Sequence, residues 1–114
     1  MLINGSNKFP KENDVVAITL IGGNEIIGKL SEITEDFIYL QRPCRLVLHM
    51  DQSSGEQALA FAPVMMSIDE KTTVRFNRTS ISVFAVQPRP DIVDGYTQAT
   101  SPIVRPAASG LVGI

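Results

Sequence analysis

The stretch from Ile18 to Leu30 constrains the fold more than any other part of the chain, because it reads as two strands joined by a glycine turn. Apolar side chains alternate with others on both sides of Gly22-Gly23-Asn24, as in half-buried strands. Glycine and asparagine tolerate the positive φ that a tight hairpin turn requires. We therefore predict a hairpin with strands over residues 14–20 and 25–33.

Gly28 is the second constraint, because it stands on the same face of its strand as Ile26 and Leu30. A glycine inside a strand marks a bend, a bulge or the close approach of another part of the chain. A small barrel made from one strongly bent sheet needs such a bend early in its second strand. Gly28 therefore predicts a small, strongly bent antiparallel β-barrel.

Further short strands follow, separated by polar turns, which favours an all-β barrel or sandwich. We expect them over residues 37–50, 58–68, 73–76 and 81–86. Pro43 predicts a bulge or an edge, because proline cannot donate a hydrogen bond within a sheet. The run 58–68 is almost continuously apolar, so we expect both of its faces to be covered.

The chain has 114 residues, which suits one domain. We expect an N-terminal segment over 1–13, the barrel over 14–87 and a proline-rich C-terminal extension over 88–114. No helix or strand period is sustained in this extension. It is either a flexible tail or an extended arm that lies on a neighbouring subunit.

Composition limits the partners. The net charge is −2, so nucleic-acid binding has to come from a local cluster, for which Arg42, Arg45 and Arg75 are candidates. The chain has no Trp, two Tyr and five Phe, which makes an extensive base-stacking platform unexpected.

Catalytic and metal motifs are missing from the sequence. The single cysteine, Cys44, and the single histidine, His49, are five residues apart on one predicted strand and so point to opposite faces. Zinc sites typically need four Cys or His ligands. The carboxylate pairs Glu35-Asp36 and Asp69-Glu70 both fall in polar turns. We expect a protein that is not an enzyme and has no metal or cofactor.

The first residues lack the basic start and apolar run of a signal peptide, and no apolar run of about eighteen residues predicts a membrane span. We therefore expect an intracellular protein, most simply a cytoplasmic one, that has no membrane partner.

The pattern Leu20-x-x-Gly23-x-x-Ile26-x-Gly28-x-Leu30 resembles the first sequence motif of the Sm/LSm (Sm-like) family without a gap. The resemblance implies a five-stranded barrel of the Sm-like or SH3-like type that forms a homo-oligomeric ring of about six or seven subunits. It also implies RNA binding and a role in ribonucleoproteins or RNA processing. The short amphipathic helix with which family members begin is not evident here.

The resemblance places one set of RNA contacts between the second and third strands. Counted from Gly28, the family's Asp, stacking and Asn positions fall on Thr34, Asp36 and Ile38, and Phe37 is the nearby aromatic residue. Isoleucine cannot form a hydrogen bond with a base edge. The base-reading pocket is therefore expected to be degenerate, and Phe37 is expected to pack in the core.

The second set precedes the last strand, where Asn77-Arg78-Thr79 is the nearest equivalent of the family's Arg-Gly pair. Arg78 suits stacking on a base or pairing with phosphate, although a solvated turn arginine would have the same sequence.

The sequence thus predicts an Sm-like ring that binds RNA. Two alternatives are open: an assembly module without nucleic acid, and a monomeric SH3-like or OB-like binding domain. The acidic composition and Ile38 favour the assembly module over a typical RNA chaperone.

Overall fold

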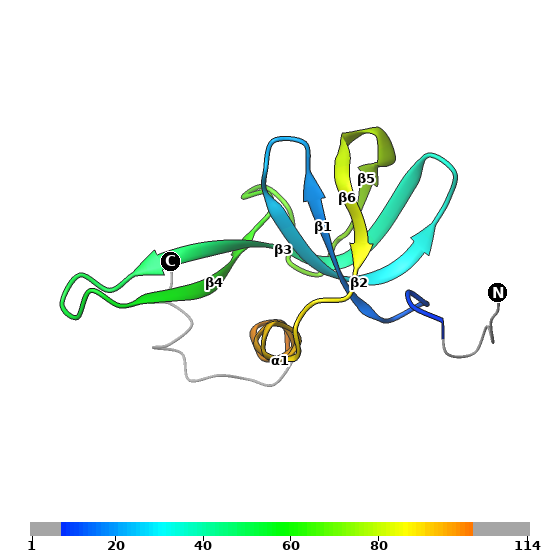
Figure 1. Cartoon of the computed structure of the whole chain (residues 1–114). Helices are drawn as coiled ribbons and strands as arrows, with labels where there is room; N and C mark the ends of the chain where they lie inside the picture. The colour runs from blue at the N-terminus through cyan, green and yellow to red at the C-terminus, as the bar shows by residue number, and fades with distance from the viewer. Residues whose placement is uncertain (1–7, 102–114) are drawn as a thin grey trace.

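The structure is a computed structural model that describes residues 8–101, and its strands form one antiparallel sheet (Figure 1). The elements are β1 (Val15–Leu20), β2 (Glu25–Ile33), β3 (Phe37–Met50), β4 (Gln57–Pro63), β5 (Thr73–Asn77), the 3₁₀ turn η2 (Arg78–Ser80), β6 (Ile81–Val86) and α1 (Pro90–Ala99). The predicted mainly β architecture is confirmed. In this part of the chain, no helix is long and apolar enough to cross a membrane.

The sheet has six strands where the resemblance implied five. The order is β4-β3-β2-β1-β6, and β5 also pairs with β3. The first part of β3 pairs with β5 and the second part with β4, so the two strands share one partner. The extra strand arises because the pairing with β3 is interrupted. The chain pairs with the second part of β3 as β4, turns away after Pro63, which has no N–H to donate, and pairs with the first part of β3 as β5 from Thr73 onward. The sheet is not closed, since β4 and β6 end the hydrogen-bonded order of the described strands.

The turn between β1 and β2 is the predicted hairpin. The φ angle of Gly23 is +99°, and its N–H donates to the carbonyl oxygen of Leu20 at 2.8 Å. The N–H of Leu20 in turn donates to the carbonyl oxygen of Asn24 at 2.9 Å. A residue with a side chain is strained at this φ, so Gly23 is required by the turn.

Gly28 is a point of close approach between β2 and β3. A Cβ atom at this position would lie 2.9 Å from the Cβ of Leu40. The register between the two strands shifts next to it, and Arg42 adopts a φ of +49° in the irregular part of β3 beside Pro43. Of the features that the sequence predicted, the close approach at Gly28 and the bulge at Pro43 are present, whereas the closed barrel inferred from Gly28 is not shown.

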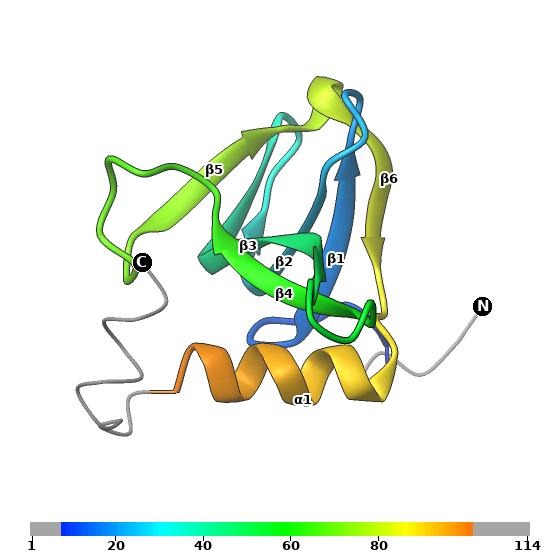
Figure 2. The ribbon, with the colours of Figure 1, turned by 90° about the vertical axis from the view of Figure 1, so that its left-hand side faces the viewer.

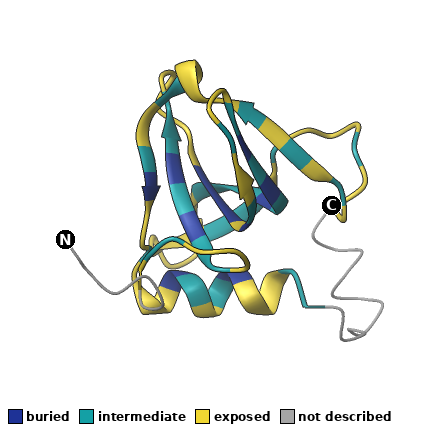
Figure 3. Cartoon of the chain, turned by 90° about the vertical axis from the view of Figure 1, so that its right-hand side faces the viewer, coloured by how far each residue is buried: buried dark blue, intermediate teal, exposed yellow. Residues whose placement is uncertain are grey.

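The main core lies on the face of the sheet opposite α1; Figure 3 marks buried residues in dark blue on the strands and on α1. The main core consists of Val16, Ile18, Ile26, Leu30, Ile38, Leu40 and Ala85. Burial of each large aliphatic side chain contributes about 1.5–3 kcal/mol. Because these residues alternate along β1, β2 and β3, one side of each strand is fixed toward the core.

Helix α1 covers part of the other face (Figure 2), where Ile92 and Tyr96 pack on Ile27. The Tyr96 hydroxyl lies 2.9 Å from the carbonyl oxygen of Arg42 and 3.0 Å from that of Gln41. The prediction that residues 88–114 contain no helix is therefore wrong for 90–99. Residues 90–99 are also not an extended arm, because they form a helix that packs on its own sheet; residues 102–114 lie outside the described part.

The β3–β4 hairpin projects from the molecule as an arm (Figure 1). Its outer part is solvent-exposed, with Leu48 at 66% and Leu59 at 42% exposure. The prediction that both faces of the fourth strand are covered is wrong, because nothing in residues 8–101 packs over the end of the arm. The strand also ends at Pro63 and not at residue 68.

Candidate functional site

The two loops that the sequence nominated for RNA contact meet in the structure. The backbone N–H of Arg78 donates to the carbonyl oxygen of Asp36 at 2.9 Å. The Nη1 atom of Arg78 donates to the carbonyl oxygen of Thr34 at 3.0 Å. The β2–β3 turn and η2 therefore form one surface from residues that are 44 positions apart.

The turn is held by its own hydrogen bonds. The hydroxyl of Thr34 accepts from the backbone N–H of Phe37 at 3.1 Å, and the Thr34 N–H donates to the carbonyl oxygen of Phe37 at 2.8 Å. Asn77 pairs with Phe37 across the strands, and Asp36, Asn77 and Thr79 are exposed. All the predicted contact residues except Ile38 thus lie on or beside the joined loops.

Arg78 presents its guanidinium in a defined position. The Cζ atom lies 4.4 Å from the centroid of the Phe84 ring, so one face of the guanidinium stacks on an aromatic side chain. Arginine carries five N–H donors, and the hydrogen bond to Thr34 uses one of them. The opposite face and the remaining donors of this exposed residue suit a phosphate or the face of a base.

Ile38 lies in the main core with 0% exposure and cannot contact a ligand at the surface. Its inclusion among the contact residues is wrong, because it alternates with Phe37 along β3 and points inward. The position that the resemblance equates with a base-reading asparagine serves the core in this chain.

An aromatic and cationic group beside the joined loops was missed. The Phe37 ring is only half-buried and lies edge-on to the Tyr39 ring at 6.3 Å between centroids. The Cζ atom of Arg75, on the neighbouring strand, lies 4.3 Å from the Phe37 centroid. Strand alternation contains the signal for this group, since inward Ile38 and Leu40 require Phe37 and Tyr39 to face outward.

The expected basic surface of Arg42, Arg45 and Arg75 is not a single cluster. Arg42 donates to the carbonyl oxygen of Thr100 at 3.0 Å, and Arg45 donates to that of Pro63 at 3.1 Å. Only Arg75 lies beside the joined loops, through its contact with Phe37. Cationic charge at the candidate site therefore comes from Arg75 and Arg78.

The two end strands of the sheet carry exposed apolar residues. On β6, Val83 is 43% and Val86 is 45% exposed. These two residues lie opposite Thr19 and Ala17 of β1. Ala17 packs against the Ile92 and Tyr96 cluster, so the apolar residues of β6 lie on the face of the sheet that carries α1.

The arm carries its apolar residues on the same face. Leu48 is paired with Leu59, two positions along from the pair of Leu46 and Phe61. Leu46 and Phe61 pack against the α1 cluster, and residues two apart on a strand share a face. The free edges of β4 and β6 therefore have an apolar border on the α1 side, and β5, which pairs only with β3, is a third free edge.

Two titratable groups beside α1, Cys44 and Tyr96, have shifted pKa values. Burial, reinforced by the negative charge of Glu70, raises the pKa of the Cys44 thiol. Burial also raises the pKa of Tyr96 to about 12. Neither shift favours the charged form at neutral pH, so Cys44 lacks the activated thiolate of a nucleophile. Over residues 8–101, no group of three or more His, Cys, Asp or Glu is placed to hold a metal ion.

The chain matches no protein-family model and no curated protein at a significant level.

Proposed function

We propose that this protein is an Sm-like assembly module whose copies pair β6 with β4 to form a homo-oligomeric ring. We further propose that the ring binds single-stranded RNA through the joined loops around Arg78. The observation that carries the assembly is that the free edges of β4 and β6 are each bordered by exposed apolar residues on the α1 face.

Edge pairing suits these strands for a physical reason. An open strand leaves backbone N–H and C=O groups without sheet partners, and pairing with another strand satisfies them. If β6 of one copy joins β4 of the next, Val83 and Val86 come beside Leu48 and Leu59 on one continuous face. A head-to-tail contact of this kind generates a ring when its rotation closes.

RNA binding is supported by the meeting of the two predicted loops and by the adjacent aromatic group. Guanidinium and aromatic faces stack on any base, while the core position of Ile38 removes a base-specific contact. We expect weak binding with little sequence preference. Glu35 and Asp36 lie in the same turn and reduce the attraction for phosphate further.

Assembly is tested with a charge on the edge strand. Light scattering after size exclusion should give wild-type protein a mass several times 12.4 kDa. Val83→Glu should lower this mass toward the monomer, because a carboxylate enters the apolar border. Thr97→Glu is the control with the same added charge, since Thr97 is exposed on α1 and belongs to neither edge strand. A wild-type monomer at micromolar concentration would rule out the ring and leave the monomeric domain.

RNA binding is tested by fluorescence anisotropy with oligo-U, oligo-A and a mixed sequence at two salt concentrations. Arg78→Ala should weaken binding to all three, whereas Arg89→Ala should not, because Arg89 lies at the start of α1 in a salt bridge with Asp91 at 2.9 Å. A ring that binds none of the RNAs at physiological salt would identify the assembly module without nucleic acid. Strong preference for oligo-U would contradict the sequence-tolerant contact proposed here.

A further inference from the structure

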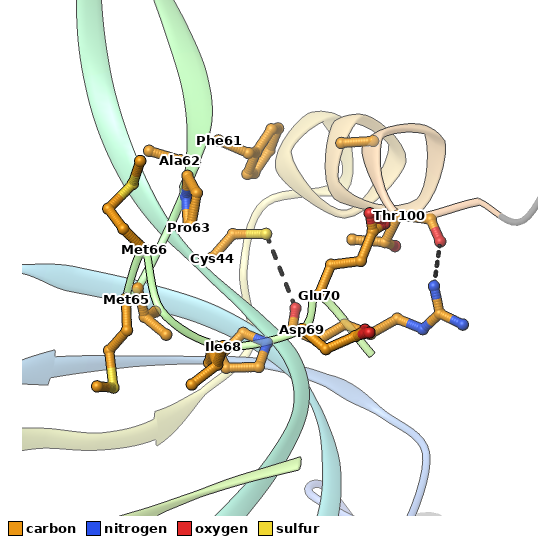
Figure 4. A pocket seen from close by; sticks show the side chains of 14 residues that line it. Cys44, Phe61, Ala62, Pro63, Met65, Met66, Ile68, Asp69, Glu70 and Thr100 are labelled. Carbon is orange, nitrogen blue, oxygen red and sulfur yellow. Dashed lines mark hydrogen bonds between the residues drawn. The ribbon is translucent and has the colours of Figure 1, made fainter. Parts of the chain in front are cut away.

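A cavity of about 460 Å³ lies between the inner part of the β3–β4 hairpin, the segment that follows β4, and the end of α1 (Figure 4). Its walls are mostly apolar and include Pro43, Cys44, Phe61, Met65 and Ile68. Cavities with apolar walls and a few polar groups are the usual binding sites of proteins. This one lies on the α1 side of the sheet and does not include the loops around Arg78.

Two carboxylates at the cavity form no salt bridge with a cationic side chain of residues 8–101. Asp69 and Glu70 line it and are exposed. The salt bridges within residues 8–101 are Lys11 with Asp14 and Arg89 with Asp91, so neither carboxylate takes part in one. The guanidinium of Arg42, which also lines the cavity, is directed to the carbonyl oxygen of Thr100. The cavity therefore suits an aliphatic group followed by a positive charge.

The chain itself contains a segment with this chemistry. Residues 102–114 lie outside the described part, but their sequence begins Pro102-Ile103-Val104-Arg105-Pro106. Arg105 is the only charged side chain among them, and it follows two branched aliphatic residues. Thr100, which lines the cavity, precedes Arg105 by five positions, a reach of at most about 18 Å for an extended chain.

We propose that the cavity is the docking site for the Ile103-Val104-Arg105 sequence of the same molecule. The aliphatic side chains would cover the Phe61 and Met65 wall, and Arg105 would pair with Glu70 or Asp69. This proposal does not depend on ring formation or on RNA. Its consequence is that the segment shields Cys44 and joins the end of α1 to the arm.

The single cysteine makes the docking measurable in the full-length protein. Cys44 lines the cavity, so an occupied cavity slows its reaction with N-ethylmaleimide. Ile103→Asp and Arg105→Glu should each accelerate this reaction roughly three- to tenfold, because each removes one half of the contact. Arg89→Glu, with the same change of charge at the other end of α1, should react at the wild-type rate.

Two further experiments distinguish docking of the segment from a general destabilisation of the fold. A synthetic peptide of residues 102–114 should slow the reaction of the Ile103→Asp variant, and the same peptide with Arg105→Glu should not. The charge-swapped protein Glu70→Arg, Arg105→Glu should return to slow labelling when rates are compared per thiolate, since Glu70 itself affects the pKa of Cys44. Wild-type labelling rates in Ile103→Asp and Arg105→Glu would overturn the proposal, whatever the mass or RNA affinity of the protein.

Discussion

The close approach of β2 and β3 at Gly28 requires that this residue has no Cβ atom. We expect Gly28→Ala to destabilise the protein by about 1–3 kcal/mol, because the new methyl group would be 2.9 Å from the Cβ of Leu40 and 3.1 Å from its Cδ1. The side chain of Leu40 is fully buried and has little room to move. Chemical denaturation measures the change in the free energy of unfolding.

Gly22→Ala is the matched control for this substitution, because no atom lies within 4 Å of a Cβ at Gly22. We expect it to change stability by less than about 0.5 kcal/mol. Gly55 is less suitable despite its exposure, since its φ is +77° and a side chain would be strained there. Equal unfolding midpoints for Gly28→Ala and Gly22→Ala would show that the close approach is not required.

Tyr96 gives the stability of the protein a dependence on alkaline pH. The folded protein raises the pKa of Tyr96 from 10.0 to about 12, so it holds the phenol proton more tightly than the unfolded chain. The resulting stability is complete below pH 10 and is lost as the pH rises through about 12. Tyr96→Phe should cost about 1 kcal/mol at pH 7, because the carbonyl groups of Gln41 and Arg42 lose their donor.

The measurement is the free energy of unfolding of both proteins between pH 7 and pH 12. Because Phe has no proton to lose, the difference between wild type and Tyr96→Phe should shrink across the upper part of this range. A constant difference up to pH 12 would contradict the raised pKa.

Residue patterns located much of the main core and the joined loops, but they misplaced individual side chains. The roles of Gly23 and Gly28 could be recognised from the sequence alone. In the structure Gly23 has a positive φ in the turn, and Gly28 lies where β2 and β3 approach closely. The outward position of Phe37 depends on which face of β3 is buried, and a motif alignment cannot decide that. The contact of Arg78 with Thr34 depends on the fold as a whole and was not predicted, since the family resemblance only assigned RNA contacts to each of the two loops.

Among the secondary-structure elements, α1 was not predicted, because its sequence lacks a clear helical pattern. It has a proline at its start and Gly95 within it, and its buried residues are only Ile92 and Tyr96. Gly95 suits its site, because a Cβ there would lie 3.0 Å from the Phe61 ring. Packing against the sheet thus decides the helix, while its intrinsic propensity is low.

We predict that α1 is an integral part of the domain. Ile92→Ala should destabilise the protein by about 2–4 kcal/mol, because Ile92 is only 8% exposed in the cluster with Ile27 and Tyr96. Thr97→Ala, on the exposed side of the helix, should change stability by less than about 0.5 kcal/mol. If both variants unfold at the same denaturant concentration, the helix contributes no stability to the sheet.

For the whole molecule, the open sheet determines what the chain can build. The described sheet has strands that are paired on one side only and an exposed arm, and such edges are available for pairing with another chain. The sequence indicated these strands, but not that β4 would project, because exposure is set by what lies over the hairpin. The same openness links the two proposed activities, since a ring would repeat Arg78 once per subunit.

The last prediction tests that link through RNA length. A ring should bind an oligonucleotide of about 24 nucleotides much more tightly than one of about six, because a long strand reaches several copies of Arg78. Its logarithm of affinity should fall more steeply with the logarithm of salt concentration, by about 0.7 for each added phosphate contact. The Val83→Glu variant should lose both effects if it is monomeric, while Thr97→Glu, with the same added charge on the exposed side of α1, should keep them. A monomeric Val83→Glu protein that retains the steep slope and the length dependence would show that avidity does not come from assembly.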